Sequence, residues 1–475
     1  MLQALENYLA GPLNRLERCV LRHGSVWFFL ILLSYYILRP IREQVGATYG
    51  TKTLSWLFSG TFVAMLIAVP LYSVLVGRFN RRWLVPLVYA IFVSSLLGFW
   101  VAFQQLPRLA QPSVAGAFFI WVSVYGLFVV SFFWSVAGDL LSSDQGRRVF
   151  GLIMGCGTLG GMVGSQIATW LVGRLGIAHL LLVPAVALVL AYRVYHRLER
   201  SVNKIGIQKR EAEGKATGGN PFAGFIAVFR SRYLLGILGF VVLMAVCSTG
   251  IYFQQSEIVG RAFSNPTLSE EEIAIRTQQL LDNPSLTISD ANVAQDRAIE
   301  ELQSEKKGQE TTAYFAQVDF AVSLATITFQ WLLAGFLMKR LGIGWTLALL
   351  PIAYLVAVIA LAFSPTLAVM AVVAVIGRSA EYGLSNPARE VLFPVIPRED
   401  RYKAKSFLDT VVRRAGDTTA GATYRWLRET VGLSVPTIAW TMIPLAILWA
   451  AVSVFLGYEN RRLAGKTRID EPSDV

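Results

Sequence analysis

The chain has 475 residues, of which 54% are hydrophobic and only 16% are charged, and its formal net charge is +12. Soluble domains carry about 25% charged residues, so this composition excludes a soluble protein built around a single core. Five segments of 25 to 30 residues contain no charged side chain, and about 20 apolar residues suffice for a helix to cross a bilayer. The sequence therefore predicts an all-α protein that crosses the membrane repeatedly.

Twelve transmembrane helices are expected, because charged loops separate the apolar runs and because Pro365 divides one long uncharged run into two spans. In chain order they cover residues 25–46, 54–77, 83–105, 114–138, 148–173, 177–196, 233–257, 312–338, 343–363, 366–396, 403–428 and 436–458. Six helices, a basic linker and six further helices make a 6+6 arrangement, which is typical of the major facilitator fold.

The loop charges orient these helices. Arg78, Arg81 and Arg82 follow the second helix, and further Lys and Arg clusters follow the sixth, eighth and twelfth helices. Cytoplasmic loops collect basic residues, so both termini are expected in the cytoplasm, and the positive charge needs no nucleic-acid partner. The expected organisation is a cytoplasmic segment 1–24, a six-helix bundle 25–197, a basic linker 198–232, a second six-helix bundle 233–458 and a cytoplasmic tail 459–475.

The second bundle contains an outward insertion over residues 258–311, which is rich in acidic side chains. Ser269 and Glu272 have the spacing of a helix capping box, and residues 290–306 have a strongly helical composition. The insertion is either a small helical cap on the outer face or a solvated acidic loop without a role in transport.

The first helix contains charged side chains that are costly to bury in a membrane. Arg39 lies roughly 20 Å along the helix, past the middle of the bilayer, and Arg42 lies one turn nearer the outer surface. We interpret Arg39, Arg42 and the neighbouring Tyr36 as substrate-binding residues and Glu43 as a coupling or gating residue. Alternatively, Arg42 and Glu43 form an ion pair at the membrane interface.

The tenth helix carries a second polar group. Arg378 lies close to the middle of the membrane, and Glu381 is three residues further on, where it can pair with Arg378. Asn386 precedes a proline that is expected to break or kink the helix, and Arg389 lies near its cytoplasmic end. All four are candidate substrate-binding residues; the alternative is an internal ion pair that only holds helices together.

The eighth and eleventh helices add further charges. Asp409, Arg413 and Asp417 are spaced by four residues and are expected to form one stripe on the eleventh helix, with Arg414 pointing elsewhere. Arg413 is a candidate for substrate binding, and Asp319 of the eighth helix, Asp409 and Asp417 are candidates for coupling or gating. Because arginine binds phosphate through two hydrogen bonds, these charges favour a phosphorylated or carboxylated substrate.

Two loops at equivalent positions of the two halves are candidate cytoplasmic gates. Asp139, Arg147 and Arg148 lie between the fourth and fifth helices, and Lys403 and Lys405 lie between the tenth and eleventh. Their charges either pair across the cytoplasmic mouth or only follow the positive-inside rule.

Several enzyme-like patterns are excluded by their surroundings. The run Gly155–Gly160 matches G-x-G-x-x-G but lies inside a transmembrane helix without a preceding strand, so it predicts close helix packing. The sequence has no phosphate-binding G-x-x-x-x-G-K-[ST] loop, no metal-ligand spacing and no recognisable catalytic array. We therefore expect a transporter rather than an enzyme, without a cofactor or a metal.

Four stretches together resemble the ATP:ADP antiporter (nucleotide transporter) family. They are Y-Y-I-L-R-P-I-R-E at 35–43, F-W-S-V-A-G-D-L at 133–140 with D-Q-G-R-R-V-F-G at 144–151, S-N-P-A-R-E-V-L-F at 385–393, and Y-K-A-K-S-F-L-D-T-V-V-R-R-A-G-D at 402–417. By position, the first-helix basic pair of that family corresponds to Arg39 and Arg42, and its eleventh-helix motif corresponds to Lys403, Lys405, Asp409 and Arg413.

The resemblance implies a major-facilitator-like carrier in a bacterial inner membrane that exchanges nucleotides, of the ATP:ADP type, without hydrolysing them. A monomer bound only to a small anion and the lipid bilayer is implied as well. Proton-coupled transport of another anionic metabolite or of a phospholipid is the alternative, because Pro40 and the order Arg42-Glu43 depart from the established exchangers.

Overall fold

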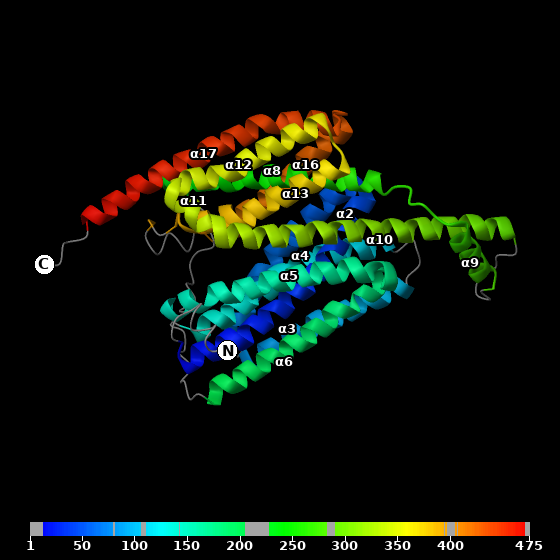
Figure 1. The fold of residues 1–475 in the computed structure, drawn as a ribbon, viewed down its shortest axis with the longest axis horizontal. Helices are drawn as coiled ribbons and strands as arrows, with labels where there is room; N and C mark the ends of the chain where they lie inside the picture. Colours follow the sequence, from blue (N-terminus) through cyan, green and yellow to red (C-terminus); the bar gives the residue numbers. More distant parts are fainter. Residues whose placement is uncertain are drawn as a thin grey trace.

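The computed structural model describes residues 13–78, 81–105, 111–141, 143–204, 228–282, 290–393, 395–396, 404–405 and 407–470. The secondary structure of these residues is entirely helical. The helices form two bundles that lie side by side along the long axis of the molecule (Figure 1). We call the end where Arg15 and Asp470 lie the terminus end, and the opposite end, which carries α9 (Glu270–Leu281), the insertion end.

The first bundle contains α2 to α6. Their bounds are α2 Arg15–Arg78, α3 Arg81–Gln105, α4 Gln111–Leu140, α5 Ser143–Leu180 and α6 Leu182–Lys204. Gly50 has a left-handed φ of 77° and divides α2 into two helices, and Gly176, with φ 70°, does the same in α5. Only glycine adopts these angles without strain, so each marks a turn between two passes.

The second bundle comes after the residues between Lys204 and Val228. It contains α8 Arg232–Ala262, α9 Glu270–Leu281, α10 Ala291–Thr328, α11 Ala334–Arg340, α12 Gly342–Phe363, α13 Leu367–Ala380, α14 Asn386–Glu390, α16 Arg413–Arg425 and α17 Val435–Asp470. Four π-helical turns interrupt these helices: η2 Phe329–Leu333, η3 Glu381–Ser385, η4 Leu408–Val412 and η5 Trp426–Thr430. A π-helical turn adds a residue and rotates the remainder of the helix, and such turns are frequent at functional sites.

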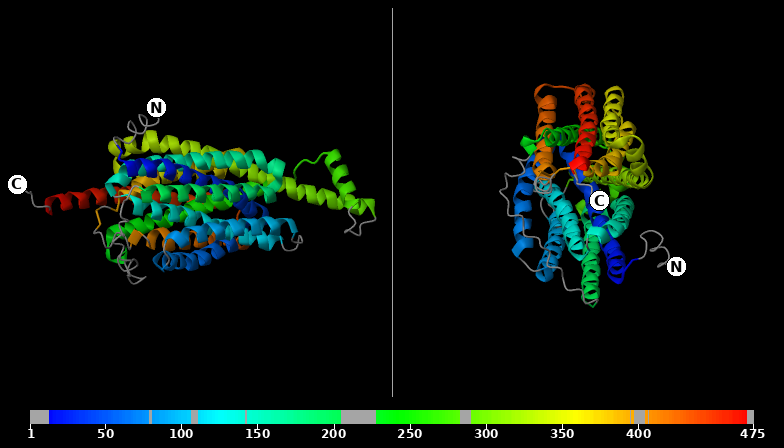
Figure 2. Two further views of the ribbon diagram at one scale, coloured as in Figure 1. Left: turned by 90° about the horizontal axis from the view of Figure 1, so that it is seen from below. Right: turned by 90° about the vertical axis from the view of Figure 1, so that its left-hand side faces the viewer.

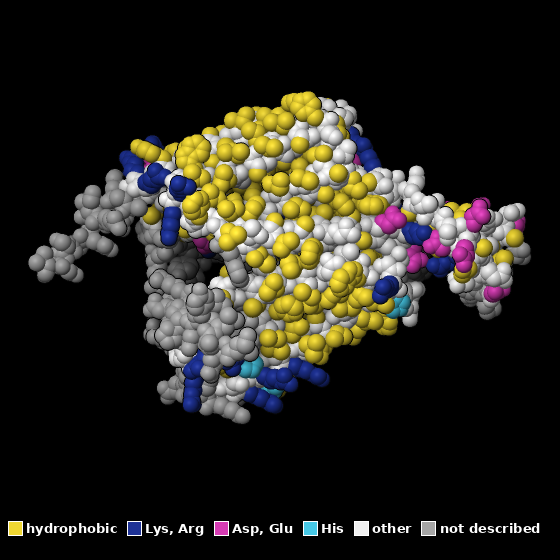
Figure 3. All heavy atoms as spheres, viewed as in Figure 1, with side chains coloured by type: hydrophobic (Ala, Val, Ile, Leu, Met, Phe, Trp, Pro, Cys, Tyr) yellow, Lys and Arg dark blue, Asp and Glu magenta, His cyan; other side chains and the backbone are white. Residues whose placement is uncertain are grey.

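The described helices are consistent with the passes expected from the sequence, although some of their ends differ. The first helix begins at Arg15, ten residues earlier than residue 25, and α17 continues to Asp470. Eight described stretches are long and apolar enough to span a bilayer on composition alone. The more polar α10 and α16 do not meet that criterion, and they carry charges of the candidate site. Apolar side chains cover the visible sides of both bundles (Figure 3).

Close packing of α5 on α2 explains the glycine-rich run of α5. A Cβ atom at Gly160 would overlap the carbonyl oxygen of Phe29, and one at Gly164 would overlap that of Leu33. The prediction that this run packs helices is therefore confirmed. The core of the first bundle lies among α2 to α6, and Trp27, Phe118 and Phe133 are buried in it.

The insertion is helical, as one of the two interpretations expected. Ser269 and Glu272 form both hydrogen bonds of the capping box that begins α9. However, residues 290–306 are not a separate helix, because α10 runs without interruption from Ala291 to Thr328. The insertion end of α10 therefore projects beyond the bundles with α9 beside it (Figures 1 and 2).

The two bundles meet at the insertion end. One apolar cluster joins Leu57 and Phe119 of the first bundle to Phe253 and Tyr424 of the second. A smaller cluster, which includes Ala47 and Phe315, lies beside it. The first helix of α2 also packs on α8, because a side chain at Gly260 would overlap the carbonyl oxygen of Ala47. We call these contacts the insertion-end seal; toward the terminus end the bundles diverge (Figure 1).

Candidate functional site

A cavity of about 870 Å³, open mouth included, lies between the bundles on the terminus side of the insertion-end seal. Helix α2 contributes the lining side chains of the first bundle, and α8, α12, α13, η3 and α16 contribute those of the second. The lining includes Arg39, Arg42, Glu43, Arg378, Glu381, Arg413, Arg414 and Asp417.

Arg39 and Arg42 enter the cavity from one face of α2, because they are three residues apart on a helix. Arg39 Nε lies 3.7 Å from a carboxylate oxygen of Glu43, and Arg42 Nη1 lies 3.4 Å from the same oxygen. The guanidinium of Arg39 lies over the ring of Tyr36, 5.7 Å from its centre, so Tyr36 supports the site from behind. Glu43 is buried and serves both arginines.

Asp319 connects the two bundles at the centre of the molecule. Its carboxylate accepts a hydrogen bond from Arg378 of α13, and its second oxygen lies 3.8 Å from Nε of Arg39. The side chain of Asp319 is only 1% exposed, so two cations from different bundles share one buried anion. This link depends on α10, which places Asp319 one turn beyond Phe315 of the seal.

The expected pair between Arg378 and Glu381 is not formed. Arg378 pairs with Asp319, and Glu381 accepts a hydrogen bond of 2.6 Å from Nη2 of Arg413. Arg378 and Glu381 thus each have a partner on another helix, and the π-helical turn η3, which begins at Glu381, rotates the part of the helix that follows it. The helix does not break at Asn386, because it continues to Glu390, and η3 ends one residue before Asn386.

The eleventh helix likewise differs from the expected stripe. Arg413 and Asp417 line the cavity, but Arg414, which was expected to point elsewhere, lines it too and lies 3.5 Å from Asp417. Asp409 lies outside the lining and pairs with Arg389 at 3.1 Å. The π-helical turn η4 ends at Val412 and shifts the face that Asp409 shares with the residues after it.

The cavity holds more positive than negative charge. Five arginines (Arg39, Arg42, Arg378, Arg413 and Arg414) face four carboxylates (Glu43, Asp319, Glu381 and Asp417), which leaves a formal charge of +1 when all are ionised. The Nε–H groups of Arg39, Arg42 and Arg378 are buried and lack acceptors among the described residues. Buried donors without acceptors are costly, so these N–H groups are suited to bind an anion.

The remaining candidate residues lie nearer the terminus end of the second bundle. Arg389 is buried beside Asp409, Lys405 lies 2.5 Å from Glu390, and Asn386 is outside the cavity lining. These two ion pairs connect neighbouring helices of one bundle. Lys403 lies outside the described residues, as do the side chains of Asp139, Arg147 and Arg148.

Helix α8 supplies lining residues that the sequence analysis missed. Ser248, Thr249, Tyr252 and Gln255 line the cavity, and Thr249 donates a hydrogen bond to Asp417. The signal was a run of hydroxyl and amide side chains within an otherwise apolar helix. Uncharged polar residues are common in packed membrane helices, so this signal is weaker than a charge.

Comparison with known proteins identifies solved structures that share this architecture. No curated protein matches the chain. Among solved structures, the nucleoside transporter NupG aligns over 95% of this chain and 99% of its own, with a TM-score of 0.54 and 14% identity. A bacterial homologue of the iron transporter ferroportin, in an inward-facing state, aligns over 94% of this chain and 99% of its own, with a TM-score of 0.57 and 14% identity. At these identities the likeness concerns the fold alone.

The family is shown by a match between the sequence and a family model. Residues 25–264, half of the chain, match the family model of the Major Facilitator Superfamily. The match includes the first bundle and α8, and the solved structures extend the same fold across the second bundle. The chain is thus a multi-pass integral membrane transporter with the 6+6 fold, and it belongs to the Major Facilitator Superfamily.

Proposed function

We propose that the protein carries a small organic anion across the membrane and that the anion is a nucleotide, exchanged in the manner of an ATP:ADP antiporter. The observation that carries this proposal is the group of buried guanidinium N–H donors without acceptors, among the described residues, in a cavity of net charge +1. Guanidinium groups bind phosphate through paired hydrogen bonds, which are stronger than hydrogen bonds between neutral groups.

The lining also offers surfaces for a ring system. Tyr252, Tyr382 and Phe58 line the cavity beside the arginines. A phosphate on the arginines and a base against the rings of the lining would fill the cavity in two chemically different parts.

Transport requires two alternating arrangements of the bundles. In the structure the insertion-end seal is closed, which is the arrangement of an inward-facing carrier if the terminus end is cytoplasmic. A substrate held by Arg39 of the first bundle and Arg413 of the second would draw the bundles together around it. Opening of the seal would then release it on the other side.

Exchange is expected because the cavity keeps one uncompensated positive charge when it is empty. Moving that charge through a closed, dry intermediate is costly, and a bound anion lowers the cost. We further propose that Lys405 and Asp409 belong to a gate at the terminus end, together with the gate candidates that lie outside the described residues. A monomer in a bacterial inner membrane completes the proposal.

The test is uptake of labelled ADP into proteoliposomes with and without ATP inside. Exchange predicts rapid uptake only into loaded vesicles, and equal rates with empty vesicles would reject it. The Arg378→Gln variant should lose uptake in loaded vesicles, whereas Arg193→Gln, which removes a charge on the lipid-facing side of α6, should keep it. Saturable uptake of another anion but not of ADP would retain the anion carrier and reject the nucleotide.

A second candidate is proton-coupled transport of another anionic metabolite or of a phospholipid. The observation that favours it is the burial of Asp319 between Arg39 and Arg378. If the substrate takes the place of this carboxylate, Asp319 loses its cations and binds a proton. Uptake that is driven by an imposed pH gradient and abolished in Asp319→Asn would support this candidate over exchange.

A further inference from the structure

A second polar pocket lies on the outside of the first bundle, remote from the central cavity. Its volume is about 610 Å³, open mouth included, and it lies between Pro86 of α3 and the last turns of α6. All of its polar and aromatic side chains come from α6: Tyr192, Tyr195, His196, Glu199, Arg200 and Asn203. Neither the family nor the proposed function assigns a role to this pocket.

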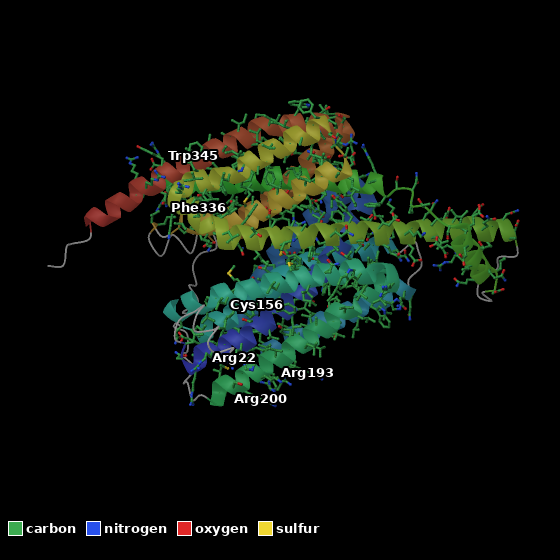
Figure 4. All side chains as sticks on the ribbon, in the orientation of Figure 1. Arg22, Cys156, Arg193, Arg200, Phe336 and Trp345 are labelled. Carbon is green, nitrogen blue, oxygen red and sulfur yellow. The ribbon has the colours of Figure 1, made fainter. Side chains whose placement is uncertain are left out.

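The pocket lies where the lipid-facing surface of α6 changes from apolar to basic. Val186 and Leu190 are exposed apolar residues, with exposed fractions of 59% and 42%. Arg193, Arg197 and Arg200 continue the same face at spacings of three and four residues, and all three are exposed. In Figure 4, Arg193 and Arg200 lie along α6 on the edge of the molecule. The change marks the boundary between the hydrocarbon and the lipid headgroups.

Glu199 distinguishes the pocket from an ordinary basic patch. Its Oε1 atom is shielded from solvent and has no hydrogen-bond partner among the described residues. A carboxylate oxygen in such a place requires a donor, and a simple anion would be repelled by it. Arg200 brings a positive charge to the same pocket, and the ring of His196 stacks on that of Tyr192 at an interplanar angle of 14°. The pocket therefore presents an acceptor and a cation within a short distance.

We infer that this pocket binds the zwitterionic headgroup of an aminophospholipid. The primary ammonium group donates to Glu199, the phosphate binds Arg200, and the acyl chains lie along the apolar face at Val186 and Leu190. A quaternary ammonium headgroup has no N–H to donate, and an anionic headgroup brings no cation for the carboxylate. The pocket thus selects a primary amine and a phosphate in one headgroup.

The test compares lipids retained by the full-length protein in native mass spectrometry. The protein is exchanged into equal amounts of phosphatidylethanolamine, phosphatidylcholine and phosphatidylglycerol. One charge-assisted hydrogen bond predicts retention of phosphatidylethanolamine about tenfold above phosphatidylcholine. The Glu199→Gln variant should lose this preference, and Arg193→Gln, which changes an arginine of the same face outside the pocket, should keep it.

Three results would overturn the inference. They are equal retention of phosphatidylethanolamine and phosphatidylcholine by the wild type, preferential retention of phosphatidylglycerol, and an unchanged preference in Glu199→Gln. Soluble phosphoethanolamine distinguishes the two sources of the same headgroup chemistry: if it displaces the retained lipid at millimolar concentration, the pocket is a site for a free metabolite. The wild-type comparison needs no variant, so the test holds even if Glu199→Gln fails to fold.

Discussion

Replacement of Asp319 by Asn should lower the free energy of unfolding of the empty carrier and increase the stabilisation that bound substrate provides. Asp319 Oδ2 lies 3.8 Å from Arg39 Nε, and the other oxygen binds Arg378. Two unit charges at that distance interact by roughly 4 kcal/mol at an effective dielectric constant of about 20. Removal of one partner from a buried ion pair costs about 3–5 kcal/mol. We therefore expect Asp319→Asn to lose free energy of unfolding of about that size in the absence of substrate.

The transported anion should recover much of this loss, because its phosphate takes the place of the carboxylate between Arg39 and Arg378. The measurement is thermal unfolding of the purified protein with and without saturating anion. Asp417→Asn is the matched control: it removes the same charge from the cavity, but Asp417 pairs with Arg414 of its own helix and links no bundles. The anion should raise Tm most in Asp319→Asn. Equal increments in the wild type and both variants would refute the idea that substrate and Asp319 compete.

Three other substitutions test the structure at separate places. Gly260→Leu should prevent closure of the insertion-end seal and lower transport at least tenfold, whereas the same change at Gly239, where the added side chain meets open space, should leave transport intact. Gly160→Leu should cost about 1–3 kcal/mol or more in thermal or denaturant unfolding because α2 and α5 must separate, while Gly151→Leu should not. Hydrogen bonds to Lys306 and Ser269 lower the pKa of Glu272 from 4.5 to about 2. The contribution of ionised Glu272 to the docking of α9 should therefore be complete above pH 4.5 and be lost as the pH falls toward 2. Distances between spin labels on α9 and α10 measure this loss in the wild type. The same distances should not change over this pH range in Glu272→Gln.

The positions of the main charges could be predicted from the sequence, but their partners could not. Arg39, Arg378 and Arg413 stand out because a charge in an apolar run is costly unless it has a use. All three lie in one cavity, and their role in binding stays a prediction. The partner of Arg378 is Asp319, which is remote in the sequence, so only the packing of α10 against α13 reveals it.

Local backbone geometry accounts for the other differences. Arg414 was expected to point away from the stripe of Arg413 and Asp417, but it lines the cavity with them and lies 3.5 Å from Asp417, three residues further along the helix. Asp409 leaves that stripe because the π-helical turn η4 lies between it and Arg413. Residue patterns do not reveal such turns, because a π-helix differs from an α-helix by one inserted residue. The lining residues Tyr252 and Gln255 were not predicted for another reason: an uncharged polar side chain in a membrane helix occurs in helix packing as well as in binding sites.

The length of α10 has a mechanical consequence. One unbroken helix runs from the solvent outside the bundles at Ala291, past the seal, to Asp319 and the π-helical turn that begins at Phe329. A molecule that binds the projecting part of α10 from the aqueous side would hold one end of a rigid helix whose other end lies among the arginines of the cavity. A force applied to α10 at the surface would thereby be transmitted to the centre of the membrane, and no molecule would have to enter the transport path.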